Sequence, residues 1–252
     1  MKRMSHSLEG RHLLRVADWE PDELRRVLDL ASELKAVPEA GSNLLPRRAL
    51  GLLFRKPSTR TRVSFEVAIG QLGGFAVSLV PDELQLSRGE SMRDTVATLS
   101  HYLDALVVRT LDHAELEEIA AHAPIPVVNG LTARAHPCQA LADALTIRER
   151  AGRLAGARVA WIGAGTNVCA SLLVLAAKLG MRFSGAFPRG YEPPAEAVDA
   201  ARAAAAESCG ELDTRAAVAD ADTVYTDVWV SMGQGGGESA PRAEGLLALI
   251  VR

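Results

Sequence analysis

Apolar residues recur along this chain with two different periods. Short apolar runs of strand length are separated by longer segments in which apolar residues return every three or four positions, as on one face of a helix. In the segment 21–35 this spacing is carried by Leu24, Val27, Leu28, Leu30 and Leu34. The pattern predicts strands that alternate regularly with helices.

The predicted elements follow one another in pairs from about residue 49 onward. Strands are expected at 49–54, 75–80, 105–108, 126–129, 158–162, 182–187 and 223–228. Helices are expected at 21–35, 58–72, 91–103, 116–122, 139–150, 168–179 and 195–207, several of them ended by glycine, as at Gly73, Gly152 and Gly180.

This alternation is typical of an α/β protein in which each sheet is mostly parallel and flanked by helices. A chain of 252 residues suffices for two such domains. We expect a first domain over residues 1–135, a connecting helix over 136–152 and a second domain over 153–252.

Composition narrows the class of protein without naming a function. The net charge is −3, which gives no basic excess for nucleic-acid binding. No apolar run approaches the roughly 18–20 residues that span a bilayer, and the N-terminus lacks the apolar segment of a signal peptide. The three cysteines form no CxxC pair and no zinc spacing with the histidines. We therefore expect a cytoplasmic protein with no metal, membrane or nucleic-acid partner.

The segment FRKPSTRTRVSFE, residues 54–66, carries the strongest chemical signal. An apolar strand ends at Phe54, Pro57 interrupts it, and Ser58 stands where a helix N-cap belongs. The first turn of the helix offers free N–H groups, to which hydroxyls and the guanidinium groups of Arg60 and Arg62 are added. Such a site suits a phosphate group. The plain alternative is a capped helix with solvated arginines.

PSTRTR after a strand resembles the carbamoyl-phosphate motif of the aspartate and ornithine carbamoyltransferases. The resemblance implies that Ser58, Thr59, Arg60 and Thr61 bind carbamoyl phosphate. It extends to Arg109, at the end of the strand DALVVR, and to HPCQALAD, which supplies His136 and Gln139 for the carbamoyl group. Arg60, Arg109 and His136 are the catalytic residues that it implies. By position alone, an arginine at a strand end such as Arg109 is more often an ordinary surface residue.

YTDVWVSMGQ, residues 225–234, resembles the loop that gives ornithine enzymes their specificity; the aspartate enzymes have an arginine-containing loop there. The resemblance assigns Asp227, Ser231 and Met232 to L-ornithine. It adds Asn167, from the turn GAGTN, although the usual family pattern has Asp and Asn where this chain has Ala164 and Thr166.

GAGTN also allows a different interpretation, because a glycine turn between a strand and a helix begins a dinucleotide fingerprint. The third glycine of that fingerprint would fall at Val168, and no clear acidic residue follows at a second strand end. A nicotinamide-dependent enzyme is therefore the weaker hypothesis.

The family resemblance has further implications. It implies that no cofactor is needed, that the protein is a homotrimer, that Gln85 reaches the neighbouring subunit's site, and that the reaction serves arginine biosynthesis. The chain ends at Arg252, before the family's HCLP segment and C-terminal helix, so it is expected to be truncated within the ornithine domain. Two alternatives follow: a non-catalytic carbamoyl-phosphate-binding homologue, or a carbamoyltransferase for a modified ornithine.

Overall fold

The computed structural model describes residues 8–85, 89–204 and 217–227. The chain divides into two compact units, Met1–Cys138 and Gln139–Arg252. The dividing point lies within helix α5 (Pro137–Ala151), which covers most of the segment expected as a connecting helix. Each unit is an α/β fold with a parallel sheet, as the sequence predicts.

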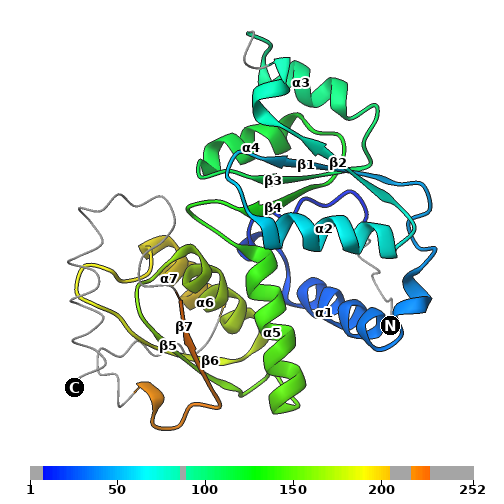
Figure 1. Cartoon of the computed structure of the whole chain (residues 1–252). Helices are drawn as coiled ribbons and strands as arrows, with labels where there is room; N and C mark the ends of the chain where they lie inside the picture. The colour runs from blue at the N-terminus through cyan, green and yellow to red at the C-terminus, as the bar shows by residue number, and fades with distance from the viewer. Residues whose placement is uncertain (1–7, 86–88, 205–216, 228–252) are drawn as a thin grey trace, which may run out of the picture. The chain divides into compact units, whose positions relative to one another are not determined.

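The first unit contains, in its described part, a four-stranded parallel sheet with the order β2-β1-β3-β4. Its strands are β1 (Ala49–Phe54), β2 (Phe75–Leu79), β3 (Ala105–Arg109) and β4 (Val127–Leu131). Its helices are α1 (Pro21–Ala36), α2 (Thr59–Gln71), α3 (Met92–Leu99) and α4 (His113–His122), with short 3-10 turns at Val16–Asp18, Pro38–Gly41 and Pro81–Glu83. Figure 1 shows α3 and α4 on one face of the sheet and α2 on the other.

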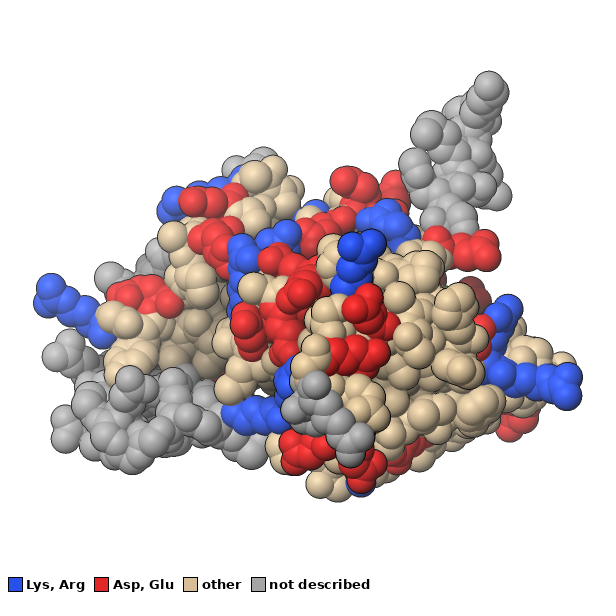
Figure 2. Space-filling model, turned by 90° about the horizontal axis from the view of Figure 1, so that it is seen from above, with Lys and Arg blue, Asp and Glu red and all other residues tan. Residues whose placement is uncertain are grey.

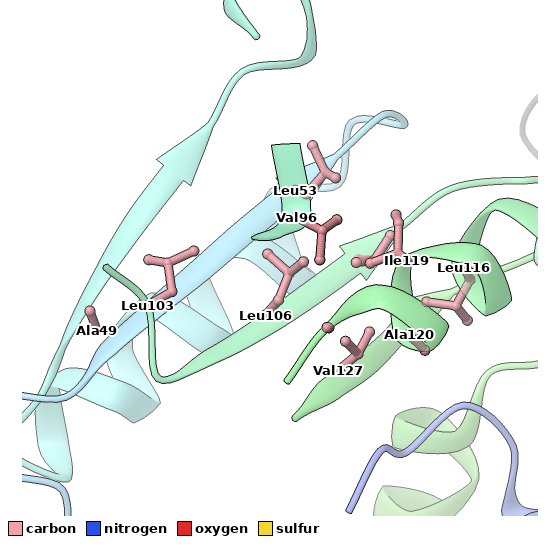
Figure 3. Packing of buried hydrophobic residues seen from close by; sticks show 11 residues of the cluster. Ala49, Leu53, Val96, Leu103, Leu106, Leu116, Ile119, Ala120 and Val127 are labelled. Atoms are coloured by element: carbon pink, nitrogen blue, oxygen red, sulfur yellow. The ribbon is translucent and has the colours of Figure 1, made fainter. Parts of the chain in front are cut away.

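One face of this sheet packs against α3 and α4 in a continuous apolar core. On β3, Leu106 and Val108 lie on one face of the sheet and Val107 on the other, and all three are buried, as expected for a strand that is covered on both faces. Figure 3 shows side chains from the strands packed against side chains from the helices. The buried residues of this core are Ala49, Leu53, Val96, Leu103, Leu106, Val108, Leu116, Ile119, Ala120, Ala123 and Val127. Because the strands pair in parallel, their carboxyl ends lie along the same edge of the sheet.

The second unit contains a three-stranded parallel sheet, among the described residues, with the order β6-β5-β7. Its strands are β5 (Arg158–Ile162), β6 (Arg182–Ala186) and β7 (Thr223–Thr226), and its helices after α5 are α6 (Asn167–Leu179) and α7 (Ala195–Ala204). Helix α6 is apolar and buried on nearly every side, which is why its sequence reads as almost continuously hydrophobic. Gly180 ends it in the left-handed conformation, as predicted.

Helix ends account for most differences from the predicted elements. Helix α3 ends at Leu99 instead of residue 103, because the chain must turn so that the Asp104 carboxylate can accept the N–H of Ala49 at 2.8 Å. Helix α4 begins three residues earlier than predicted, because the Asp112 carboxylate caps the N–H of Ala114. The last predicted residues of α7, 205–207, lie outside the described part.

One face of the protein is mixed in charge. On the face seen in Figure 2, acidic and basic side chains lie interspersed among uncharged residues. Within the described ranges, every helix is too short or too polar to cross a membrane.

Candidate active site

The first unit places its candidate residues at the point where the strand order of the sheet reverses. Strand β1 has β2 on one side and β3 on the other, so the loops that follow β1 and β3 leave in opposite directions. Phe54 at the end of β1 pairs with Arg109 at the end of β3, and the N–H of Arg55 donates to the Arg109 carbonyl at 2.9 Å. Ligands of open parallel sheets bind at such switch points.

Helix α2 begins directly after this point, at Thr59. Ser58 is its N-cap: its Oγ accepts the N–H of Thr61 at 3.4 Å and donates to the Thr61 Oγ1 at 2.9 Å. The other first-turn N–H groups have no carbonyl within the helix and, with the helix dipole, attract an anion. Thr59 and Arg60 are exposed here, and Arg60 has no carboxylate partner in the described part of the chain. The prediction of a capped helix start is confirmed.

Arg109 is buried, with only 5 % of its surface exposed. Its side chain donates to the carbonyl of Gly130 at 3.3 Å, whereas its Nε has no hydrogen-bond partner among the described residues. No described carboxylate forms an ion pair with it. Burial lowers the pKa of the guanidinium. A buried guanidinium with an unpartnered Nε and no carboxylate beside it is chemically suited to bind an anion.

The neighbouring arginine is already neutralised. Arg55 forms an ion pair with Glu115, whose other oxygen accepts a hydrogen bond from Thr110 at 2.6 Å. This pair leaves the charge of Arg109 uncompensated while it ties the start of the loop after β1 to helix α4.

A tight turn after β4 carries the chain to His136. The N–H of Thr132 donates to the Ala135 carbonyl at 3.0 Å, and the N–H of Ala135 donates back to the Thr132 hydroxyl at 3.2 Å. Asn129, which is fully buried, donates to the carbonyls of Leu14 at 2.8 Å and Ala135 at 3.3 Å. His136 therefore stands at a fixed place, immediately before Pro137 opens α5.

Cys138, in the first turn of α5, shows no sign of activation. Burial raises the pKa of its thiol to about 12, so the thiol stays protonated at neutral pH. Its Sγ donates to the carbonyl of Asn129 at 3.5 Å. A nucleophilic role is therefore not supported by its surroundings.

The second unit repeats the switch-point arrangement. Strand β5 has β6 on one side and β7 on the other, so the turn after β5 and the end of β7 meet at one edge. There Thr166 caps helix α6, and its hydroxyl donates to the Asp227 carboxylate at 2.9 Å. Asn167 follows as the first residue of α6, with its Oδ1 on the N–H of Val168 at 2.9 Å. The structure thus brings Asn167 and Asp227 to the same edge.

The glycine turn of GAGTN has a packing explanation. The N–H of Gly165 donates to the carbonyl of Tyr191 at 2.7 Å. A Cβ on Gly165 would lie 2.2 Å from the backbone nitrogen of Pro193. Only glycine permits this close approach, so the turn requires glycine here without any dinucleotide.

Tyr225 joins this edge from strand β7. Its ring stacks on Trp161 of β5 with centroids 4.8 Å apart. Burial, together with the nearby Asp143 carboxylate, raises the pKa of its hydroxyl. The pKa of Asp143 is raised mainly by burial and further by the charge of Asp227. These side chains form a half-buried acidic cluster beside the Thr166–Asp227 contact.

Three expected binding residues are not placed by these contacts. Ser231 and Met232 lie outside the described residues. Gln85 is exposed, and its carbonyl accepts the N–H of Glu90 at 3.2 Å, across a segment that is not described.

Comparison with known proteins identifies both halves of the chain. Residues 11–149 match the family model "Aspartate/ornithine carbamoyltransferase, carbamoyl-P binding domain", and residues 155–247 match the model "Aspartate/ornithine carbamoyltransferase, Asp/Orn binding domain". The chain belongs to the aspartate/ornithine carbamoyltransferase family.

Individual family members are similar over most of the chain. The ornithine carbamoyltransferase of Anoxybacillus flavithermus is 48 % identical over 233 residues, which cover 90 % of this chain and 74 % of that protein. The solved ornithine carbamoyltransferase of Pyrococcus furiosus superposes with a TM-score of 0.89 at 43 % identity, covering 95 % of this chain and 78 % of that one. The enzyme of Thermus thermophilus gives 0.83 at 38 % identity, covering 94 % and 78 %.

Several residues of this family member were missed by the sequence analysis although the structure places them at the candidate sites. Asp143 was detectable in principle, because it stands four residues after Gln139 on the same helix face. Tyr225 shares a strand face with Asp227 at a spacing of two. Asn129 and Glu115 gave no usable signal, since their roles depend on contacts with distant segments. Among the described residues, no group of histidine, cysteine or acidic side chains could hold a metal ion.

Proposed function

We propose that this protein transfers the carbamoyl group of carbamoyl phosphate to the δ-amine of L-ornithine, giving L-citrulline and phosphate. The observation that carries the proposal is the buried Arg109, whose Nε has no hydrogen-bond partner among the described residues, at the same switch point of a parallel sheet as the capped start of α2. The high identity to an ornithine carbamoyltransferase supports the choice of acceptor.

Carbamoyl phosphate is a dianion with a carbonyl group, and each part has a candidate partner. The phosphate would take the N–H groups and hydroxyls of Ser58, Thr59 and Thr61 together with the Arg60 guanidinium. The carbonyl oxygen would accept hydrogen bonds from Arg109 and His136. Gln139, in the first turn of α5, would bind the carbamoyl NH2 group, and Gln85 would be contributed by a neighbouring subunit.

L-Ornithine would bind the second unit through its amino-acid end. The Asp227 carboxylate suits the α-ammonium group, and Thr166 holds one of its oxygens in place at 2.9 Å. Asn167 at the start of α6 offers an amide for the α-carboxylate, where the helix dipole also favours an anion. Ser231 and Met232 complete the proposed set of ornithine-binding residues.

The chemistry requires neither a metal nor a covalent enzyme intermediate. The neutral δ-amine attacks the carbamoyl carbon and forms a C–N bond, the carbonyl oxygen takes the negative charge, and collapse of the adduct expels phosphate as the amine loses a proton. Arg109 and His136 stabilise the oxyanion, and one such donor is typically worth about 2.7–4 kcal/mol. Holding the two substrates in attack geometry contributes about 7–11 kcal/mol more.

The family also suggests the biological setting of the reaction. We propose a cytoplasmic homotrimer that serves arginine biosynthesis. The net charge of −3 gives no basic excess for nucleic-acid binding, and the proposed partners are the two substrates and other copies of the chain.

The direct test is citrulline formation from carbamoyl phosphate and L-ornithine by the purified full chain. Turnover with free ornithine that falls by about 10²–10³ in Arg109→Met, but is unchanged in the exposed control Arg182→Met, would support the proposal. Turnover only with N-acylated ornithine would show a different acceptor. Thermal stabilisation by carbamoyl phosphate without any turnover would show a binding protein instead.

A further inference from the structure

The side-chain amide of Gln139 is held at one end by a carboxylate. Its Nε2 donates to the Asp143 Oδ1 at 3.0 Å, one helical turn further along α5. An ionised carboxylate can only accept hydrogen bonds, so the NH2 group of the amide must face Asp143. The Gln139 carbonyl oxygen is thereby turned away from Asp143.

We infer that Asp143 is a positioning residue that presents the Gln139 carbonyl oxygen, rather than its NH2 group, to the NH2 group of the carbamoyl donor. This inference rests on the proposed function. The carbamoyl NH2 group has two hydrogens to donate, so it needs an acceptor. The reversed amide would set NH2 against NH2 at the ligand and oxygen against carboxylate at Asp143, and both contacts are repulsive.

The surroundings of Asp143 make this selection sensitive to pH. The groups that face the carboxylate are the Gln139 amide from α5, the Tyr225 hydroxyl from β7 and the Asp227 carboxylate at the end of β7. The Oδ2 atom is buried and has no hydrogen bond of ordinary geometry within the described part. Burial and the charge of Asp227 raise the pKa of Asp143, so it takes up a proton more readily than an exposed aspartate. Once protonated, it can donate to the Gln139 carbonyl oxygen and no longer selects the orientation.

Two substitutions separate orientation from simple loss of the contact. Asp143→Ala releases the amide, and we expect the KM for carbamoyl phosphate to rise about tenfold. Asp143→Asn can hold the amide in either orientation, and we expect a rise of only about two- to threefold. The exposed Asp199→Asn on α7 is the matched control and should leave both Michaelis constants unchanged.

A double-mutant cycle tests whether Asp143 acts through Gln139. In a Gln139→Ala background, Asp143→Asn should produce no further change in the KM for carbamoyl phosphate. The wild type should also show a rise in this KM as pH falls through the raised pKa of Asp143, and Asp143→Asn should remove that rise. Additive effects, or an unchanged pH profile in Asp143→Asn, would overturn the inference.

A measurement that does not depend on turnover separates this inference from the proposed function. The side-chain ¹H–¹⁵N signals of Gln139, assigned by their absence in Gln139→Ala, should titrate with the protonation of Asp143. They should stop titrating in Asp143→Asn but not in Asp199→Asn. If the wild type makes no citrulline yet these signals titrate, the proposed function fails and the hydrogen-bond selection stands. If citrulline forms but the signals do not titrate, the inference fails alone.

Discussion

Arg109 provides the sharpest prediction, because its fold-stabilising and catalytic effects have opposite signs. The guanidinium is 5 % exposed and makes one side-chain hydrogen bond, 3.3 Å long, to the carbonyl of Gly130. A buried ion without a counter-ion costs several kcal/mol even after relaxation, roughly 3 or more. Arg109→Met keeps an unbranched side chain about as long as the aliphatic part of arginine but removes the guanidinium and its charge, at the cost of about 1–3 kcal/mol for a carbonyl left unsatisfied. With roughly 3 kcal/mol gained and about 1–3 kcal/mol lost, we therefore expect the ligand-free variant to be more stable by up to about 2 kcal/mol.

The same Arg109→Met substitution should lower the enzymatic activity, although it raises the stability of the ligand-free protein. Loss of one oxyanion donor lowers kcat by about 10²–10³. The variant should also lose the thermal stabilisation by carbamoyl phosphate, which reaches about 2.7 kcal/mol at a hundredfold excess over Kd. The assays are citrulline production and calorimetric unfolding with and without carbamoyl phosphate. In the unfolding assay, each kcal/mol shifts the midpoint temperature by about 2–4 °C for a protein of this size. Arg182→Met, an exposed arginine at the start of β6, serves as the control.

Two results would refute this reasoning. A ligand-free Arg109→Met that unfolds at a lower temperature than the wild type would show that Arg109 stabilises the fold. Unchanged turnover in a stabilised variant would show that Arg109 does not bind the substrate.

Three further predictions follow from individual contacts. Thr166→Val removes the hydrogen bond to Asp227 and the cap of α6. The KM for ornithine should therefore rise about tenfold, while the KM for carbamoyl phosphate stays unchanged. A rise in both Michaelis constants in steady-state assays would contradict this. Ser58→Ala removes the cap of α2, so it should lower the unfolding free energy by about 1 kcal/mol and also weaken carbamoyl-phosphate binding measured by calorimetry. The control Ser91→Ala removes the cap of α3 and should lower only the unfolding free energy. The Nδ1 of His12 accepts the N–H of Val127 at 3.0 Å, and burial lowers the pKa of this histidine. The stability that His12 contributes should therefore be fully present above the ordinary histidine pKa and be lost as pH falls below it. His12→Asn, which keeps an acceptor, should reduce the pH dependence of the unfolding free energy measured with urea, and an unchanged pH dependence would assign it to another group.

The fold could be predicted largely from local patterns. Buried parallel strands such as 105–108 are short and uniformly apolar, and the helices between them carry their own start and stop signals, as at Ser58 and Gly180. Helix ends without a local signal were missed. The end of α3 is set by the contact of Asp104 with Ala49, a residue 55 positions away in the chain.

The candidate site was only half accessible to sequence reasoning. Ser58 could be predicted from its position at a helix start that follows a strand. Arg109 and Asp227 lie at strand ends, where open α/β sheets bind ligands, but their roles were predicted only with the help of the family resemblance. Residues that hold them could not be predicted. Asn129 fixes the turn before His136 by reaching Leu14, which is 115 positions away in the chain. A buried amide in the middle of a strand carries no local mark of such a role.

The two units have the same arrangement of a sheet switch point and a capped helix, but they place opposite charges at it. In each, the strand order reverses beside β1 or β5, and a capped helix begins at that point, with Ser58 in the first unit and Thr166 in the second. The strand across the switch point then sets the charge: β3 ends in the cation Arg109, whereas β7 leads to the anion Asp227. A cation beside a helix start selects a dianion such as carbamoyl phosphate. An anion beside a helix start favours a zwitterion, whose ammonium and carboxylate groups find opposite partners, and an α-amino acid has this charge pattern.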